Sequence, residues 1–355
     1  TTSENNFDYT RQLPENLVQL NEISMNFYWC WRSEGVALFR DLDSALWDKC
    51  EQNPRLMLKK ISGLRLWQRS ADNNYVARVE SFYSEYRNYI ASASDAAKSP
   101  DIAYFCAEYG VHNSLPNYSG GLGILAGDYL KEASDRNTNL IAVGLLYRYG
   151  YFQQAISLHG EQIHQLEAAK FTQLPIAPVR DARGEWIKIH VNFAGRTVWA
   201  KVWQLSVGRV PLYLLDTDID DNRWEDRSIT HQLYGGDNEN RLRQEILLGI
   251  GGARAIKAME IEPDLYHLNE GHAAFLGLER LRNYLKNKHL PYDAALEIVR
   301  ATQLFTTHTP VPAGHDAFSE ALLRDYLFEF TFALDISWEE LLAFGRLDAN
   351  NPNEL

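Results

Sequence analysis

The sequence has few cysteines, no long apolar run and no excess of basic residues. Its three cysteines, Cys30, Cys50 and Cys106, lie in apolar surroundings without the spacing of a metal site, as expected for buried thiols in a reducing compartment. No apolar run approaches the about 18 residues that span a bilayer, and the polar N-terminus does not resemble a signal peptide. The formal charge of −12 argues against nucleic acid or an anionic membrane as a partner. We therefore expect a cytoplasmic protein.

The length and composition are those of a globular protein with a large core. Of the 355 residues, 45% are hydrophobic and 23% charged, and the length predicts about two domains. Helical spacing of apolar residues recurs in the first part of the chain, at residues 14–27, 33–46 and 76–90. A small, polar stretch that ends in proline follows at residues 91–100. We predict a helical subdomain over residues 1–95 and a second domain over residues 96–355.

Downstream, strand patterns alternate with helical patterns. Short apolar strands are predicted at residues 102–106, 140–146, 264–268 and 304–307. Helical spacing appears between them, at residues 124–134, 241–258 and 272–286. This alternation indicates an α/β fold with a parallel sheet, in which ligands bind beyond the carboxyl ends of the strands. Residues that alternate with a period of two predict a β insertion at about residues 185–216.

The run Gly120-Gly121-Leu122-Gly123 lies between the first of these strands and a helix. Adjacent glycines let the backbone approach a ligand closely, and the first N–H groups of a helix lack intrahelical partners and attract anions. This predicts a phosphate or other anion site at Gly120 and Gly121. The alternative is that the glycines serve only close packing of the helix.

The same run also fits the dinucleotide fingerprint G-x-G-x-x-A, from Gly121 to Ala126. That fingerprint should follow its strand directly, whereas about a dozen residues intervene here. No acidic residue closes the next strand, where a ribose would be held. An NAD-dependent oxidoreductase is therefore disfavoured as an interpretation.

Three polar loops follow predicted strands and should open on the same side of the sheet. They begin at Glu108, at Asn269 and at His308. A histidine in such a loop can offer a ring nitrogen to a hydroxyl, although it can also simply cap the sheet. His267 and His272 are five residues apart, which does not match the H-E-x-x-H zinc pattern, so we expect no metal.

One further loop candidate stands apart from these strands. Asp237 and Asn238 follow two glycines and form either an ordinary turn or a loop that gates a substrate.

Several longer motifs resemble the α-glucan (glycogen/maltodextrin) phosphorylases, especially their shorter bacterial branch. The first two are Ala103-Tyr104-Phe105-Cys106-Ala107-Glu108-Tyr109-Gly110 and Tyr118-Ser119-Gly120-Gly121-Leu122-Gly123-Ile124-Leu125-Ala126-Gly127-Asp128. Shorter matches follow in the same order, at residues 143–152, 234–237, 241–245, 267–275 and 306–315. The N-terminal residues 26–31 also fit that branch. The matches extend over nearly the whole chain.

This resemblance implies a two-domain glycosyltransferase of the GT-B type, with two Rossmann-like domains. The implied reaction is the reversible phosphorolysis of a terminal α-1,4-linked glucose to glucose 1-phosphate, with retention of configuration. The implied partners are α-1,4-glucan, orthophosphate and glucose 1-phosphate. The implied cofactor is pyridoxal phosphate, which acts through its phosphate group. Members of this family are commonly homodimers.

The resemblance also assigns roles to individual residues. Gly121 would direct its N–H toward the phosphates, in the region of Gly120, and Leu122 would direct its N–H toward the glucosyl unit. His308 would hold the glucose 6-hydroxyl. The remaining candidates would lie near the sugar: Asp237 and Asn238 on a mobile loop, and Glu270 and His272 at polar positions. The animal enzymes carry Asp where Glu270 stands, so its role is the least secure.

In this family, the lysine that binds pyridoxal phosphate as a Schiff base belongs to the C-terminal domain. No stretch of this sequence resembles that motif. We therefore expect the chain to correspond to the N-terminal domain and, in isolation, neither to hold the cofactor covalently nor to turn over. Two alternatives stay open. A glycogen or starch synthase would use a sugar nucleotide and carries a lysine where this chain has Tyr118, and a non-catalytic module would bind glucan independently of His308 or Asn238.

Overall fold

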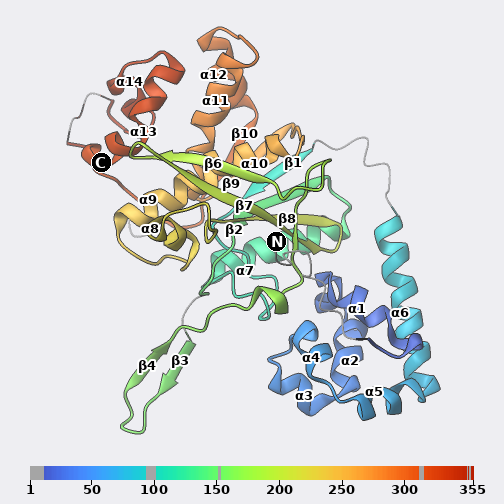
Figure 1. Cartoon of the computed structure of the whole chain (residues 1–355). Helices are drawn as coiled ribbons and strands as arrows, with labels where there is room; N and C mark the ends of the chain where they lie inside the picture. The colour runs from blue at the N-terminus through green and yellow to red at the C-terminus, as the bar shows by residue number, and fades with distance from the viewer. Residues whose placement is uncertain (1–11, 93–100, 151–152, 312–315, 350, 352) are drawn as a thin grey trace.

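The computed structural model describes residues 12–92, 101–150, 153–311, 316–349, 351 and 353–355. Most of the boundary predicted at residues 91–100 lies outside these ranges, as do residues 151–152 and 312–315 of the quoted motifs. The described chain forms a cluster of helices beside a larger unit built on a mixed sheet (Figure 1). A hairpin of β3 (Gln153–Ile156) and β4 (Gln162–Gln165) extends away from that sheet.

Two of the three predicted N-terminal helices are interrupted, whereas α6 (Asn73–Ala91) contains the whole of the third, residues 76–90. The helices before α6 are η1 (Glu15–Leu17), α1 (Gln19–Ser24), η2 (Phe27–Trp31), α2 (Ser33–Leu42), α3 (Ser44–Lys49), α4 (Pro54–Lys60) and α5 (Gly63–Ser70). Asp43 interrupts the helix predicted over residues 33–46, because its side chain caps α3 by accepting a hydrogen bond from the N–H of Leu46. Asn26 interrupts the first predicted helix similarly and accepts from the N–H of Tyr28.

The central sheet has the strand order β10–β9–β1–β2–β8–β7–β5, with β6 also paired to β7. Its strands are β1 (Ile102–Phe105), β2 (Leu140–Leu145), β5 (Ala177–Pro178), β6 (Lys188–Phe193), β7 (Arg196–Val207), β8 (Val210–Asp216), β9 (Leu265–Asn269) and β10 (Gln303–Thr306). The strands from β10 to β8 are parallel, whereas β7 runs antiparallel to β8. The predicted α/β class with a mainly parallel sheet is confirmed. The segment predicted as a β insertion forms one side of this sheet, because β8 pairs with β2.

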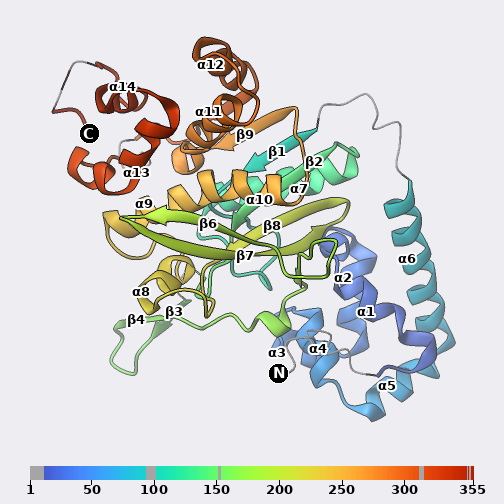
Figure 2. The same ribbon diagram turned by 45° about the horizontal axis from the view of Figure 1, so that its top comes forward.

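Helices cover both faces of the sheet. α7 (Gly121–Asp135) lies on the face that the N-terminal helices approach (Figure 1). The other face carries α9 (Asn238–Ile246), η6 (Leu247–Gly251), α10 (Gly252–Ala258) and α11 (Leu276–Lys286), and Figure 2 shows α10 lying along the strands. The remaining helices are α8 (Trp224–Arg227), η5 (Ser228–Thr230), η7 (Gly271–Ala273), α12 (Tyr292–Ala301), α13 (Glu320–Leu334) and α14 (Trp338–Ala343).

Side chains of each strand alternate between two cores. In β1, Tyr104 packs in the core that contains Ala126 and Leu130 of α7. Its neighbours Ala103 and Phe105 pack in the core on the side of α10. Because successive side chains of a strand point to opposite faces, a fully buried strand shows a continuous apolar run. This explains why residues 102–106 lack the alternation of an exposed strand.

The helix predicted over residues 241–258 is continuous but contains a wider turn. η6 is a π-helical turn between α9 and α10. A Cβ atom at Gly249 would lie 2.6 Å from the N atom of Leu276, and one at Gly252 would lie 2.7 Å from the Phe105 ring. The glycines in and beside this turn therefore allow the helix to pack closely against its neighbours.

The strand order reverses direction at β1. From β1 the chain passes through α7 to β2, which lies on one side, whereas β9 and β10 lie on the other side. Ligands of open α/β sheets bind at such a reversal, beyond the carboxyl ends of the strands. The loops that begin at Glu108, Asn269 and His308 follow the adjacent parallel strands β1, β9 and β10, so the prediction that they open on the same side is confirmed.

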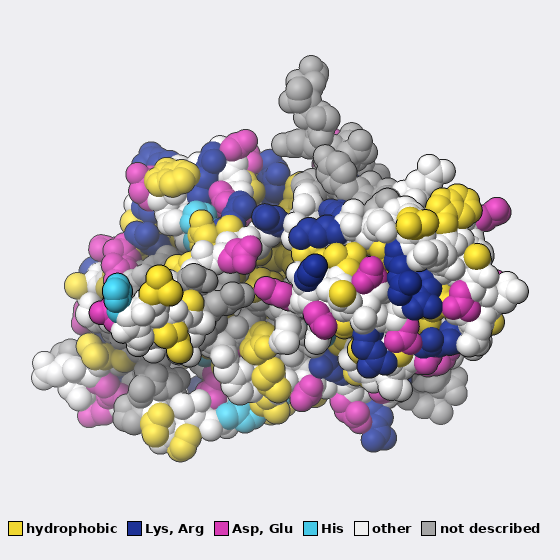
Figure 3. All heavy atoms as spheres, turned by 90° about the horizontal axis from the view of Figure 1, so that it is seen from below, with side chains coloured by type: hydrophobic (Ala, Val, Ile, Leu, Met, Phe, Trp, Pro, Cys, Tyr) yellow, Lys and Arg dark blue, Asp and Glu magenta, His cyan; other side chains and the backbone are white. Residues whose placement is uncertain are grey.

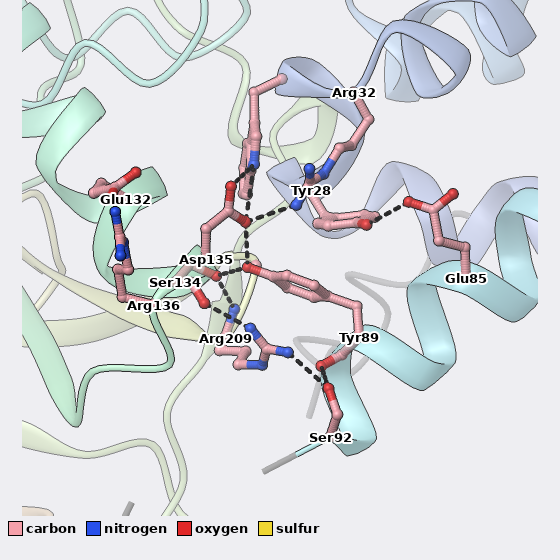
Figure 4. A network of polar contacts seen from close by, with 12 residues as sticks. Tyr28, Arg32, Glu85, Tyr89, Ser92, Glu132, Ser134, Asp135, Arg136 and Arg209 are labelled. Carbon is pink, nitrogen blue, oxygen red and sulfur yellow. Dashed lines mark hydrogen bonds and ion pairs between the residues drawn. The ribbon is translucent and has the colours of Figure 1, made fainter. Parts of the chain in front are cut away.

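Polar contacts join the N-terminal helices to the end of α7 and to the β7–β8 turn. Asp135 of α7 accepts hydrogen bonds from Arg32 and from the Tyr89 hydroxyl, at 2.7 and 2.9 Å, as Figure 4 shows. Arg209 of the turn donates to the carbonyl of Ser134 and stacks on the Tyr89 ring. These contacts anchor the C-terminal end of α7, whose N-terminal end carries the glycine run.

Charges of both signs share the surface. On the face shown in Figure 3, Lys and Arg side chains lie among Asp and Glu side chains. Among the described residues, no helix combines the length and the apolarity needed to cross a membrane. Likewise, no group of three or more His, Cys, Asp and Glu side chains in the described ranges is arranged to hold a metal ion.

Candidate active site

The glycine run forms the N-terminus of α7. Gly120 is the N-cap residue, and no side chain caps this helix. Within the described part of the chain, the N–H groups of Gly121 and Leu122 donate no hydrogen bond. A Cβ atom at Gly120 or Gly121 would meet no atom within 4 Å, so the backbone is open at both positions. This arrangement suits an anion, which free helix N–H groups and the helix dipole attract.

The later glycines of α7 have a different purpose. A Cβ atom at Gly123 would lie 2.4 Å from the Tyr118 Cβ atom, and one at Gly127 would lie 2.3 Å from the carbonyl oxygen of Gly110. These two glycines serve close packing, whereas Gly120 and Gly121 leave the helix N-terminus accessible. Close packing thus explains Gly123 and Gly127, and the anion site at Gly120 and Gly121 stays a prediction.

Glu108 fixes the turn that precedes α7 by hydrogen bonds to its backbone. Its side chain is buried, and its Oε2 atom accepts hydrogen bonds from the N–H groups of Ser119 and Gly120, at 2.7 and 3.4 Å. Its Oε1 atom accepts from the Tyr234 hydroxyl at 2.6 Å. Glu108 thus joins the glycine turn to the segment that leads to Asp237.

His308 follows β10 and is held by the loop after β9. Its Nε2 atom lies 2.9 Å from Oδ1 of Asn269, whose Nδ2 atom donates to the sulfur of Cys106 at 3.4 Å. The backbone N–H of His308 donates to Oε1 of Glu270 at 2.5 Å. The ring and the backbone of His308 are therefore both fixed, although the side chain is exposed.

Glu270 supports this loop as an acceptor. The hydroxyls of Thr307 and Thr309 donate to its carboxylate at 3.0 and 3.1 Å. Burial alone would raise the pKa of Glu270, but these bonds and the His308 N–H lower it, so the carboxylate form is favoured. Its φ of 61° lies in the left-handed region, which a non-glycine residue occupies only when its surroundings hold it there.

His272 lies beside Tyr234, at 6.0 Å between ring centroids. Its Nδ1 atom is buried without a hydrogen-bond partner in the described structure. Burial, followed by the charge of Arg241, lowers the pKa of His272 and favours the neutral ring. The free nitrogen of a neutral imidazole can accept one hydrogen bond from a hydroxyl or donate one to it.

Arg241 also contacts Tyr234. Its guanidinium stacks on the Tyr234 ring at 4.6 Å from the centroid and forms an ion pair with Asp316. Burial, followed by Asp316, raises the pKa of Glu245 to about 9. One oxygen of the Glu245 carboxyl group has no partner among the described residues.

The structure places Asp237 and Asn238 at the start of α9. Both are exposed, and the Asp237 side chain caps the helix by accepting from the N–H of Asn240 at 2.9 Å. The turn interpretation thus describes their local structure. The Asp237 carboxylate makes no described contact with His308 or with the glycine turn.

The residues brought together by contact are Glu108, Tyr234, His272 and the glycine turn on one side, and Asn269, Glu270 and His308 on the other. Sequence reasoning did not assign roles to Glu108, Tyr234 or Arg241. A signal for Glu108 was present, because a carboxylate directly after a buried strand of an α/β sheet lies at the ligand-binding edge.

Comparison with known proteins identifies relatives of this chain. A family profile described as "Protein of unknown function (DUF3417)" matches residues 13–115. In an alignment of 338 residues that covers 90% of this chain, the chain is 41% identical to the glycogen phosphorylase of Mycobacterium tuberculosis. It is 40% identical to the maltodextrin phosphorylase of Thermococcus litoralis over 94% of its length, and 36% identical to the glycogen phosphorylase of Aquifex aeolicus over 89%.

This chain is homologous to part of the glycogen and maltodextrin phosphorylases. The resemblance drawn from its motifs is confirmed. The matched region covers 39%, 41% and 45% of these three relatives, so the chain spans about two fifths of their length. The DUF3417 match begins in the N-terminal helices and extends beyond β1 to Leu115, so it includes Glu108.

Proposed function

We propose that this chain is the N-terminal, substrate-contacting part of a GT-B type α-1,4-glucan phosphorylase. The observation that carries the proposal is the open N-terminus of α7, where the N–H groups of Gly121 and Leu122 lack acceptors among the described residues. It lies at the sheet edge that also bears His308. The proposed partners are glucan, orthophosphate and glucose 1-phosphate, within a cytoplasmic homodimer.

Each candidate residue has a proposed part in phosphorolysis. The N–H of Gly121 stabilises the negative charge of phosphate, and that of Leu122 faces the glucosyl unit; fixed dipoles of this kind need no reorganisation during reaction. His308, oriented by Asn269, binds the 6-hydroxyl of the terminal glucose. His272, Glu270, Asp237 and Asn238 line the approach to the sugar.

The residues present fit a phosphate group. The N–H groups of Gly121 and Leu122 donate to no described acceptor, and a Cβ atom at Gly120 or Gly121 would meet no atom within 4 Å. Pyridoxal phosphate, when bound, supplies a phosphate group that exchanges a proton with the substrate phosphate. The part that this chain plays is to orient the phosphate by backbone N–H groups and to hold the glucose.

The test has two parts. In an amide NMR titration of this chain, glucose 1-phosphate should shift the signals of Gly121 and Leu122, whereas NAD should not. In the complete gene product, orthophosphate and maltodextrin should give glucose 1-phosphate, and ADP-glucose should not serve as a donor. Transfer from ADP-glucose, with no phosphorolysis, would instead identify a synthase.

A further inference from the structure

Glu108 is a buried carboxylate between two segments to which the proposed function assigns ligands. One segment is the glycine turn, and the other runs from Tyr234 to Asp237 at the start of α9. The carboxyl group is 2% exposed and accepts from the Ser119 N–H at 2.7 Å, the Gly120 N–H at 3.4 Å and the Tyr234 hydroxyl at 2.6 Å. The Ser119 hydroxyl adds a longer contact of 3.5 Å.

These partners are neutral groups. Both oxygens of the Glu108 carboxylate accept hydrogen bonds, from two N–H groups and one hydroxyl, whereas a glutamine has only one oxygen that could accept. A glutamate therefore holds the turn and Tyr234 together in a way that its neutral analogue does not. Its negative charge lies next to the N–H groups that would bind an anion from outside.

Glu108 decides which N–H groups remain for such an anion. Its Oε2 atom occupies the N–H groups of Ser119 and Gly120, and the next two, those of Gly121 and Leu122, stay free in the described structure. An incoming glucose 1-phosphate is thus directed to the next two donors, with its phosphate at the Gly121 N–H and its glucosyl unit at the Leu122 N–H, because the Ser119 and Gly120 N–H groups are taken and the carboxylate repels phosphate there. The Glu108 side chain thus determines which backbone N–H groups remain for an anion.

Tyr234 connects Glu108 to the segment that leads into α9. Its φ of 55° is left-handed, a conformation that a tyrosine keeps only when its surroundings fix it. The surroundings are Glu108 at its hydroxyl and the Arg241 guanidinium on its ring. Residues 235–237, which lead into α9, therefore take their position from the residue that also holds the glycine turn.

We propose that Glu108 is a positioning residue that directs glucose 1-phosphate to the N–H groups of Gly121 and Leu122 and that couples this turn, through Tyr234, to Asp237 and Asn238. This inference rests on the proposed function for the identity of the anion. The contacts of Glu108 themselves can be tested without any ligand.

The experiment uses this chain with three variants, Glu108→Gln, Tyr234→Phe and, as a matched control, Tyr118→Phe. Tyr118 also donates its hydroxyl to a side chain, that of Asn113 at 3.0 Å, but at an exposed site. Amide hydrogen exchange and a glucose 1-phosphate titration are followed at Ser119, Gly120, Gly121 and Leu122. In Glu108→Gln, loss of the charged acceptor should speed exchange at Ser119 and Gly120 about tenfold or more, whereas Tyr234→Phe, which leaves both of these N–H bonds in place, should speed it less.

A second readout separates positioning from a merely structural role. In the unmodified chain glucose 1-phosphate should shift Gly121 and Leu122 only, whereas in Glu108→Gln the response should spread to Ser119 and Gly120. In Tyr234→Phe, which removes one hydroxyl, the affinity for glucose 1-phosphate should fall about tenfold, and the unfolding midpoint should also fall because Oε1 of the buried carboxylate loses this donor. The control should match the unmodified chain in every measurement.

The outcomes distinguish the two claims. Unchanged exchange at Ser119 and Gly120 in both variants, or an unchanged pattern of shifts in Glu108→Gln, would overturn the positioning role while leaving the proposed function intact. If glucose 1-phosphate shifts none of these signals in the unmodified chain, the phosphate site of the proposed function is wrong. The exchange rates then decide alone whether Glu108 holds the turn.

Discussion

The Nε2 atom of His308 lies 2.9 Å from the Oδ1 atom of Asn269. Because an amide oxygen only accepts, Nε2 carries the proton and Nδ1 is left as an acceptor. The ring that we propose to bind a glucose hydroxyl is thus oriented by a buried side chain of the neighbouring strand.

His308→Ala should weaken the binding of maltoheptaose by about 1–2 kcal/mol, the value of one lost hydrogen bond with its partner left unsatisfied. Isothermal titration of the chain with maltoheptaose measures this loss. His159→Ala, at an exposed position of the β3–β4 hairpin, is the matched control and should bind normally. Equal affinity in both variants would favour a glucan-binding module that does not use His308.

Gly121→Ala and Gly127→Ala should have opposite effects on stability. At Gly121 the added methyl group meets nothing within 4 Å, so the helix gains about 0.4–1 kcal/mol from reduced chain entropy. At Gly127 it would lie 2.3 Å from the Gly110 carbonyl, which should cost about 1–3 kcal/mol. Urea unfolding measures both changes.

The same two variants separate stability from binding. The Gly121→Ala methyl group occupies the approach of an anion, so glucose 1-phosphate binding should weaken although the fold becomes more stable. If Gly121→Ala binds normally, the open turn is not the phosphate site.

Glu245 should make stability depend on pH. Its pKa in the fold, about 9, lies above the ordinary value of 4.5, first because of burial and then because of Asp316. The folded state therefore holds a proton that the unfolded state releases, so this contribution is complete below about pH 4.5 and is lost as the pH rises toward 9.

Glu245→Gln removes this titration, so its stability relative to the unmodified chain should be greater at pH 8 than at pH 5, by about 4 kcal/mol. Urea unfolding at both pH values provides the measurement, with exposed Glu297→Gln as the control. A difference that does not grow with pH would show that Glu245 is charged in the fold.

The apolar pattern was sufficient to predict the parallel strands and the longer helices around them, but not the short elements. β1, β2, β9 and β10 lie within two residues of their predicted ends, because each is an apolar run between polar turns. The β3–β4 hairpin was not predicted: its Ile156 and Leu158 are exposed, so no buried face produces a period. α4 and α5 were missed because each is too short to show several helical repeats.

The candidate site shows the same limit. Gly121 and His308 could be chosen as candidates from the sequence because each follows a strand of the predicted sheet, and the structure places both after such strands. The pairing of Glu108 with Tyr234 could not be predicted, since it joins residues 126 positions apart and depends on the path of the chain between them. Asp237 was found, but its helix-capping role becomes visible only in the structure.

Asn26→Ala should weaken the attachment of the N-terminal helices to the sheet. The buried Asn26 side chain donates to the Gly208 carbonyl and accepts from the Gly208 N–H, both at 2.8 Å, and loss of both bonds should cost about 2–4 kcal/mol. Unfolding in urea tests this. Asn16→Ala removes a single, partly buried bond to the Ser70 carbonyl and should cost less than half as much.

The π-helical turn at Leu247–Gly251 keeps two neighbouring helices out of phase with each other. Shortening it by one residue would make the helix regular and would rotate α9 against α10 by about 100°. If Gly252 kept its packing against Phe105, Arg241 would lose its contacts with Tyr234 and Asp316. A single-codon deletion far from the glycine turn would thereby dismantle the polar cluster at the opposite end of the same helix.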